Sequence, residues 1–252
     1  DVNPYLIGVS NQAAIEYDEA DTKPNDMRYY SLKLRYAHFI ISVDGERLSG
    51  VTLKSIIPED AKIVEIIEGE ITASDFPFPE NMTSLTVREG VSVTSIPSSA
   101  FSENVYLKNV YIMSTTDFDI SEEAFSSCSS LTFVQISGAK TIKGLAFKWC
   151  SNLKTVILDD VETIVGNSHF EGCNELKSIS MQSLKTIPQE SNRIFLGCSK
   201  MITIKLPSAP PQRFNKDTFN GLQDQLSLVL PNEIDYLTYD DDKGVDGDIN
   251  EN

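Results

Sequence analysis

One pattern, Phe-x-x-Cys-x-x-apolar, occurs four times along the chain and contains all four of its cysteines. The same frame extends to three further copies in which another residue stands at the Cys position. The seven anchors are Phe78, Phe101, Phe125, Phe147, Phe170, Phe195 and Phe219, spaced by 23, 24, 22, 23, 25 and 24 residues. Self-similarity at this period indicates a repeat architecture, in which each unit is one structural element stacked on the next.

Each unit also carries the signal of one short strand. Nine and eleven residues after most anchors stand two apolar residues, such as Val110 and Ile112, and this alternation predicts a strand with one buried face. The Phe78 copy has Val87 at the first of these positions but Glu89 at the second. Because so small a unit cannot bury its own apolar face, the units must stack and share a core. The sequence therefore predicts a leucine-rich-repeat-type solenoid, with a parallel β-sheet on the concave face and turns or short helical turns on the convex side.

Two units, A-F-S-S-C-S-S-L at 124–131 and A-F-K-W-C-S-N-L at 146–153, carry a family resemblance. They resemble the A-F-x-x-C-x-x-L core of the BspA-like leucine-rich repeats, and the resemblance covers roughly residues 71–231. It implies an exported or lipid-anchored protein of host-associated bacteria that binds other proteins at the cell surface, and it implies no enzymatic activity. The chain starts at Asp1 without Met, which is compatible with a removed signal through which a lipid anchor is attached.

The repeat divides the chain into three regions. Residues 71–231 form the solenoid of about seven repeats, and residues 232–252 form an acidic tail. Residues 1–70 do not match the repeat, and their strand-like runs predict a β-rich N-terminal cap or a separate small domain. Those runs lie at 28–43, 51–57 and 63–71, and the first ends at Asp44-Gly45, a hairpin-turn signal.

The formal charge of −16 divides unevenly, with −6 in residues 1–70, −3 in 71–231 and −7 in the tail. An acidic chain of this kind does not offer the basic stripe that nucleic-acid binding requires. No apolar run reaches the roughly 20 residues of a membrane span. The acids from Asp240 to Asp248 bring oxygens together as calcium loops do, but Gly244 stands where a ligand belongs, so an acidic disordered tail is favoured.

The residues that could carry chemistry do not form a recognisable constellation. The cysteines contain no C-x-x-C pair, and the repeat places each in its own coil, which favours buried, reduced, structural thiols over metal ligands or disulfides. His38 and His169 are the only histidines, and no nucleophile elbow, phosphate loop or zinc motif accompanies them. We therefore expect no catalytic residue, no metal site and no cofactor.

Positions eight and ten of each unit are expected to face outward from the sheet. On three successive units they hold Tyr111, Phe133 and Ile157, with Gln135 between them, which predicts an apolar stripe on an otherwise polar surface. The aromatic residues could instead pair along the sheet for local stability, or be covered by the cap. Trp149 stands where three later copies have glycine and is also expected to be exposed.

Three functions of different classes follow from this sequence. The first is a surface-displayed or secreted module that binds an extracellular protein, from a host or from bacteria, through Tyr111, Phe133, Gln135 and Ile157, with Trp149 as a further candidate. The second is a carbohydrate-binding accessory protein of a glycan-uptake system, with Trp149 or Tyr111 as the sugar-stacking platform. The third is a structural spacer that holds the N-terminal region away from the cell envelope.

Overall fold

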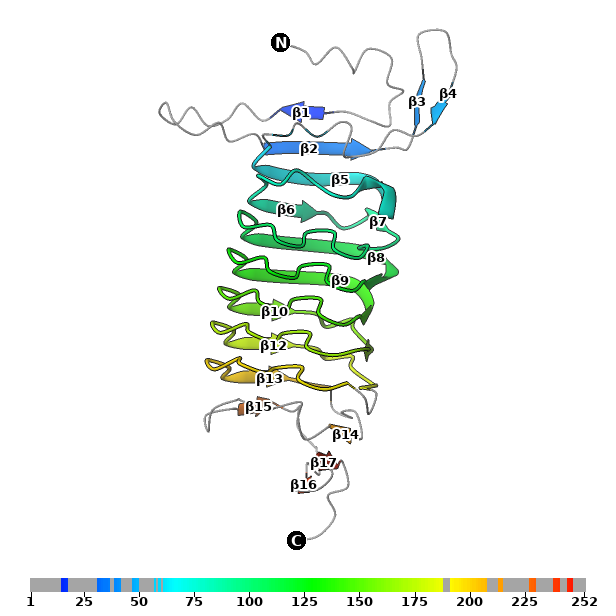
Figure 1. Cartoon of the computed structure of the whole chain (residues 1–252). Helices are drawn as coiled ribbons and strands as arrows, with labels where there is room; N and C mark the ends of the chain where they lie inside the picture. The colour runs from blue at the N-terminus through cyan, green and yellow to red at the C-terminus, as the bar shows by residue number, and fades with distance from the viewer. Residues whose placement is uncertain are drawn as a thin grey trace.

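In the computed structural model the chain is an elongated stack of coils with one long β-sheet along its side (Figure 1). The structure describes residues 61–187 and 191–207, residues 57 and 59, and several short strands outside these ranges. The main path of the sheet runs through β1 (Ile15–Tyr17), β2 (Ser31–Tyr36), β5 (Ile63–Ile71), β6 (Ser84–Val87), β8 (Asn109–Ile120), β9 (Phe133–Ile142), β10 (Thr155–Ile157), β12 (Ser178–Ser180), β13 (Thr203–Lys205) and β15 (Ser227–Val229). Apart from the antiparallel pair β1–β2, all neighbours on this path are parallel, which confirms the predicted solenoid.

The register places corresponding residues of successive repeats side by side. Val110 pairs with Val134, which pairs with Val156, and the series continues through Ile179 and Ile204. All five side chains are buried, so the positions nine residues after each anchor face the core as predicted. At these positions the coils therefore stack in register, without a sideways shift from one strand to the next.

A second parallel ladder, which the sequence did not predict, runs along the other end of the coils. Its strands include β7 (Ser92–Val93) and β11 (Thr163–Ile164), which pair with the far ends of β5 and β9. Ile120 pairs with Ile142, and Ile142 pairs with Ile164. Ile120 and Ile142, each five residues before its anchor, are therefore strand residues, because β8 and β9 are long enough to serve both ladders.

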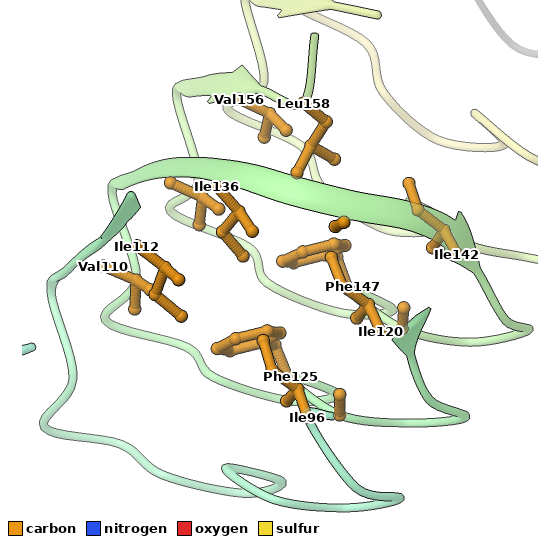
Figure 2. Close-up of a cluster of buried hydrophobic side chains, with 14 of the residues drawn as sticks. Ile96, Val110, Ile112, Ile120, Phe125, Ile136, Ile142, Phe147, Val156 and Leu158 are labelled. Atoms are coloured by element: carbon orange, nitrogen blue, oxygen red, sulfur yellow. The ribbon is translucent and has the colours of Figure 1, made fainter. Parts of the chain in front are cut away.

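The anchors form a continuous aromatic stack through the core. Centroid distances between successive rings from Phe101 to Phe195 are 4.9, 5.0, 5.3 and 5.6 Å, with the rings nearly parallel. Figure 2 shows Phe125 and Phe147 pointing toward the inward residues of the strands, including Ile112 and Ile136. Each ring fills the space that its coil and the next enclose together.

The cysteines lie beside this stack and join neighbouring coils. Each thiol is free and buried, and each donates a hydrogen bond to the carbonyl of the preceding anchor Phe, over 2.9, 3.0, 3.1 and 3.1 Å. Burial raises the pKa of the Cys198 thiol to about 12. The prediction of buried, reduced, structural cysteines is confirmed for all four.

In the coils from Phe101 to Phe195 the wall that carries the anchors, which we call the back wall, is built of turns, and a single helical turn, η2 (Ala73–Asp75), stands before Phe78 within the described residues. In each of five coils the residues two before and two after the Phe have positive φ, at Ser99/Glu103, Glu123/Ser127, Leu145/Trp149, Ser168/Gly172 and Arg193/Gly197. Alternate amides therefore point to the next coil: the Phe125 N–H donates to the Ala146 carbonyl over 2.7 Å, and the Ser126 N–H donates within its own coil to Glu123 over 2.9 Å. The backbone bonds coil to coil on this wall as well as in the sheet.

The first coils correct two details of the predicted boundaries. Strand β5, which we assigned to the cap, lies in the solenoid sheet between β2 and β6, so the sheet crosses the boundary at residue 70. In the Phe78 coil Leu85 pairs with Val110 and Val87 pairs with Ile112. This coil is therefore two residues shorter between anchor and strand, and Glu89 was wrongly placed at a core position.

The predicted hairpin in the cap is present as β3 (Phe39–Ile41) paired antiparallel with β4 (Arg47–Ser49) around Asp44-Gly45. The predicted strand at 51–57 lies outside the described residues, Ile57 excepted. In the acidic tail, β16 (Thr238–Asp240) and β17 (Gly244–Asp246) pair with each other, and β17 pairs with β14 (Arg213–Phe214). The prediction of a disordered tail did not include these strands.

Candidate ligand-binding surface

The side chains that point away from the core on strands β6 to β13 form one surface, which we call the sheet face. Tyr111 on β8 and Phe133 on β9 lie together on it, with ring centroids 4.9 Å apart and planes inclined by 29°. Tyr111 is 37% exposed and Phe133 is partly exposed, so no described part of the chain covers this pair. Since both strands are held by parallel pairing, the position of the rings is fixed by the scaffold.

The register brings two more predicted residues to the same place. Gln135 lies between Tyr111 and Ile157, paired with each of them on the neighbouring strands. Sequence reasoning missed Met113, which is 37% exposed and whose sulfur lies 3.8 Å from Nε2 of Gln135. Met113 stands two residues after Tyr111 and so faces outward by the same alternation. A longer predicted strand would have included it. We call the five residues Tyr111, Met113, Phe133, Gln135 and Ile157 the sheet-face patch.

Polar side chains flank the sheet-face patch along the solenoid. Corresponding positions hold Ser84 and Thr86 on β6, Ser178 and Ser180 on β12, and Thr203 and Lys205 on β13. Ser180 was expected to be exposed, but it is 8% exposed, and its hydroxyl donates to Oδ1 of Asp159 over 2.5 Å. An apolar centre with a polar surround is the arrangement found at protein-binding sites.

A bulge in β8 lies directly after Met113, at one end of the sheet-face patch. Met113 pairs with Ser137 and Phe118 pairs with Ala139, so the four residues 114–117 face the single residue Gly138. A Cβ atom on Gly138 would lie 2.5 Å from the carbonyl oxygen of Thr116, and its φ of +88° is one that glycine adopts readily. The bulge turns β8 from the sheet face toward the second ladder.

Trp149 is exposed as predicted, at 57%, but it does not lie with the other four predicted residues. It belongs to the back wall, across the core from the sheet face. Its ring covers Gly172 of the next coil, where a Cβ atom would lie 2.4 Å from the indole, and Nζ of Lys148 lies 4.6 Å from the ring centroid. The five residues predicted as one ligand-binding set thus occupy two separate surfaces.

His169 is buried in the position that alanine occupies in three other coils, and it serves no evident chemistry. Its Nε2 lies 2.9 Å from the Val165 carbonyl, while Nδ1 has no hydrogen-bond partner within the described residues. Desolvation lowers the pKa of His169 to about 4, so the ring is neutral at pH 7. No group of three His, Cys, Asp or Glu side chains within the described residues could hold a metal ion.

This buried histidine predicts a loss of stability in mild acid. Below pH 6.5 the unfolded chain binds a proton at His169 that the folded chain, with its pKa near 4, does not bind, so stability falls as pH decreases. Between pH 7 and 5 the loss from this residue is expected to be about 2 kcal/mol. Urea unfolding of the wild type and of His169→Ala across that range measures this loss as a difference in how steeply the free energy of unfolding depends on pH. His38 is present in both proteins, so its contribution cancels. Parallel slopes would contradict the neutral, buried assignment.

Comparisons with known proteins find leucine-rich repeat proteins. The sequence model described as BspA type Leucine rich repeat region, in six copies, matches residues 64–139 and 118–240. The crystal structure of the T. pallidum leucine-rich repeat protein is similar to this chain, with 20% sequence identity over 64% of this chain and 78% of that protein and a TM-score of 0.47. A leucine-rich repeat protein from Bacteroides ovatus is 16% identical over 87% of this chain and 77% of its own, with a TM-score of 0.32.

No curated protein matches the sequence. Within the described residues, no helix has the length and apolar character needed to cross a membrane. The matched repeats include every strand that contributes to the sheet-face patch, from β8 to β10.

Proposed function

The chain belongs to the BspA-type leucine-rich-repeat family, and from this premise we propose that it is a binding module that recognises a protein partner through the sheet-face patch. Leucine-rich-repeat proteins are in general protein-interaction modules and typically have no enzymatic activity. In this proposal the partner is an extracellular protein of a host or of another bacterium, and the chain acts at the cell surface or after secretion.

The exposed, stacked pair of Tyr111 and Phe133 is the observation that carries the proposal. Large aromatic side chains that are rigid before binding supply contact area at a low entropic cost, and they dominate the energetics of many interfaces. Gln135 adds a hydrogen-bonding group within the apolar centre, and Met113 adds a flexible side chain that adapts to a partner. The parallel strands fix the spacing of all these groups, so recognition requires little reorganisation of the scaffold.

We expect the double substitution Tyr111→Ala with Phe133→Ala to weaken binding by about 30-fold or more, because hot-spot residues contribute about 2 kcal/mol or more. The stability should fall by only about 1 kcal/mol, because the pair is exposed and stacking adds about that much. The wild type is first measured by biolayer interferometry against a panel of purified extracellular matrix and bacterial surface proteins. The affinity of the variant is then measured for each protein that binds the wild type.

The matched control is Thr203→Ala with Lys205→Ala, which removes the corresponding side chains on β13 and leaves the sheet-face patch intact. Binding unaffected by the Tyr111/Phe133 substitution would remove the patch from the proposal. Saturable binding to a defined glycan on an array, with no protein partner in the panel, would favour the carbohydrate-binding function instead.

A further inference from the structure

The residue that directly precedes each strand of the main sheet is exposed or partly exposed, and these residues form a line along the solenoid that we call the strand-entry row. In chain order the row is Lys62, Thr83, Lys108, Thr132, Lys154, Lys177 and Ile202. Each member after Lys62 donates its backbone N–H to the carbonyl of the previous member, over 2.7 to 2.9 Å. These bonds show that the seven residues lie side by side, one per coil.

The four lysines of this row differ from nearly all the other cations in the described part of the chain. Seven Lys and Arg side chains there form ion pairs, and they are Arg88, Lys140, Lys143, Lys148, Lys185, Arg193 and Lys200. Within the same residues no carboxylate forms an ion pair with Lys62, Lys108, Lys154 or Lys177, and among the basic residues there only Lys205 shares this property. Within the described residues, carboxylates therefore pair with most other cations but not with those of the row, where Nζ of Lys62 donates to the Asn81 carbonyl over 3.3 Å.

The surroundings of the row keep that charge open. The next residues along the strands, including Ser84, Asn109, Phe133 and Thr155, carry no charge. Lys200, paired with Glu175 at 2.5 Å, lowers the pKa of that carboxyl most, and the charges of Lys154 and Lys177 lower it to a smaller extent. A line of unpaired cations on a protein of net charge −16 is a site of charge complementarity for an anionic ligand.

The spacing of the lysines indicates the shape of that ligand. Lys62, Lys108 and Lys154 stand on alternate coils, so their positions repeat every 10 Å or so along the solenoid. The threonines between them do not fill the gaps, because Thr83 and Thr132 donate their hydroxyls to the backbone carbonyls of Lys62 and Lys108, over 2.9 and 3.0 Å. The result is a straight series of cations separated by short side chains.

An exposed aromatic ring lies against the same row. Tyr106 is 50% exposed, and Nζ of Lys62 lies 5.7 Å from its ring centroid. An aromatic face next to a cation suits a sugar ring that carries a carboxylate, because the ring stacks while the charge pairs. A globular protein rarely presents acids in a straight line at a constant interval, whereas a linear polymer does.

We propose that the strand-entry row binds a linear anionic polysaccharide along the solenoid axis, with one carboxylate per disaccharide facing Lys62, Lys108 and Lys154 in turn. The row borders the sheet-face patch, because Thr132 directly precedes Phe133, but none of its lysines belongs to that patch, and the proposal does not depend on a protein partner. The ligand class is a polymer of alternating uronic acid and neutral sugar. Lys177 lies on the coil directly after Lys154, about 5 Å further and off the 10 Å interval, and adds positive charge at that end of the row.

The test uses the full chain and hyaluronan oligosaccharides as the probe, with titration calorimetry at low salt. The double variant Lys108→Ala with Lys154→Ala should weaken binding at least tenfold, and it should also reduce the dependence of affinity on salt, because fewer counterions are exchanged. The control variant Lys140→Ala with Lys185→Ala removes two lysines that are already ion-paired with Glu162, and it should retain the wild-type affinity.

Three outcomes would overturn the proposal: no binding of hyaluronan or chondroitin sulfate, equal losses in both double variants, or equal binding of a neutral cello-oligosaccharide. Equal binding of poly-L-glutamate, lost in the same lysine variant, would assign the row to acidic proteins and also overturn it. The Tyr111→Ala with Phe133→Ala variant should bind the polysaccharide normally, which separates this site from the proposed function.

Discussion

Replacing Phe147 by alanine should lower the free energy of unfolding by about 3–5 kcal/mol, the range for loss of a buried aromatic side chain. Phe147 is fully buried at the centre of the stack, with Phe125 at 5.0 Å on one side and Phe170 at 5.3 Å on the other. Its backbone already bonds to the adjacent coil, so the walls cannot collapse easily into the space left behind. Urea unfolding followed by far-ultraviolet circular dichroism gives the measurement.

The control for this substitution is Phe133→Ala, which removes the same side chain from the sheet face instead of the core. It should cost about 1 kcal/mol, because the ring remains partly in water and loses mainly its stacking on Tyr111. A Phe147→Leu variant should fall between the two. If Phe147→Ala cost no more than Phe133→Ala, the aromatic stack would not be the main source of cohesion between coils.

A second large effect is expected from Gly138→Ala, which should destabilise the protein by about 3 kcal/mol. Part of the cost is the left-handed backbone at φ +88°, worth roughly 1–2 kcal/mol for a residue with a Cβ atom. The remainder comes from overpacking, because the Cβ would lie 2.5 Å and 2.9 Å from the backbone carbonyl oxygens of Thr116 and Ser114. These atoms belong to the bulge and are not free side-chain ends that could move aside.

Gly90 is the matched control, since its φ is +94° but a Cβ atom there would meet nothing within 4 Å. Gly90→Ala should therefore show only the backbone cost, about 1–2 kcal/mol. Thermal or urea unfolding of the two variants separates strain from crowding. Equal losses would show that the bulge relaxes around the added methyl group, and that the close approach of Gly138 to β8 is not required.

The sequence predicted those features of the fold that depend on the same positions being buried in every coil. An inward position such as Val134 or a thiol such as Cys150 faces the same neighbours one coil later, so the same residue type returns at the same interval. The frame of the anchors, the inward face of the strands and the role of the cysteines could all be inferred in this way. The outward positions of Tyr111, Phe133, Gln135 and Ile157 followed, because strand alternation fixes them once the inward positions are known.

Other features arise where one coil departs from the average. The bulge at 114–117 lies within an apparently regular strand, and only the pairing with Gly138 reveals it. The short Phe78 coil shifted the predicted frame by two residues for the same reason. The left-handed backbone of Leu145 and Trp149 has no composition signal either, since Ser, Glu or Arg stands at the position of Leu145 in the other described coils and glycine holds that of Trp149 only in later coils. Met113 and the strand-entry row were missed because both depend on where strands begin and end.

The two walls that bond coil to coil have a mechanical consequence. Hydrogen bonds in the sheet and on the back wall run along the solenoid axis, so a force that pulls the two ends apart along that axis loads the coils in series. The coil with the weakest contacts then opens alone, and its 23 or so residues lengthen the chain by roughly 80 Å at most. A molecule anchored at one end and held by a partner at the other would therefore extend in steps, and the remaining coils would keep their binding surfaces.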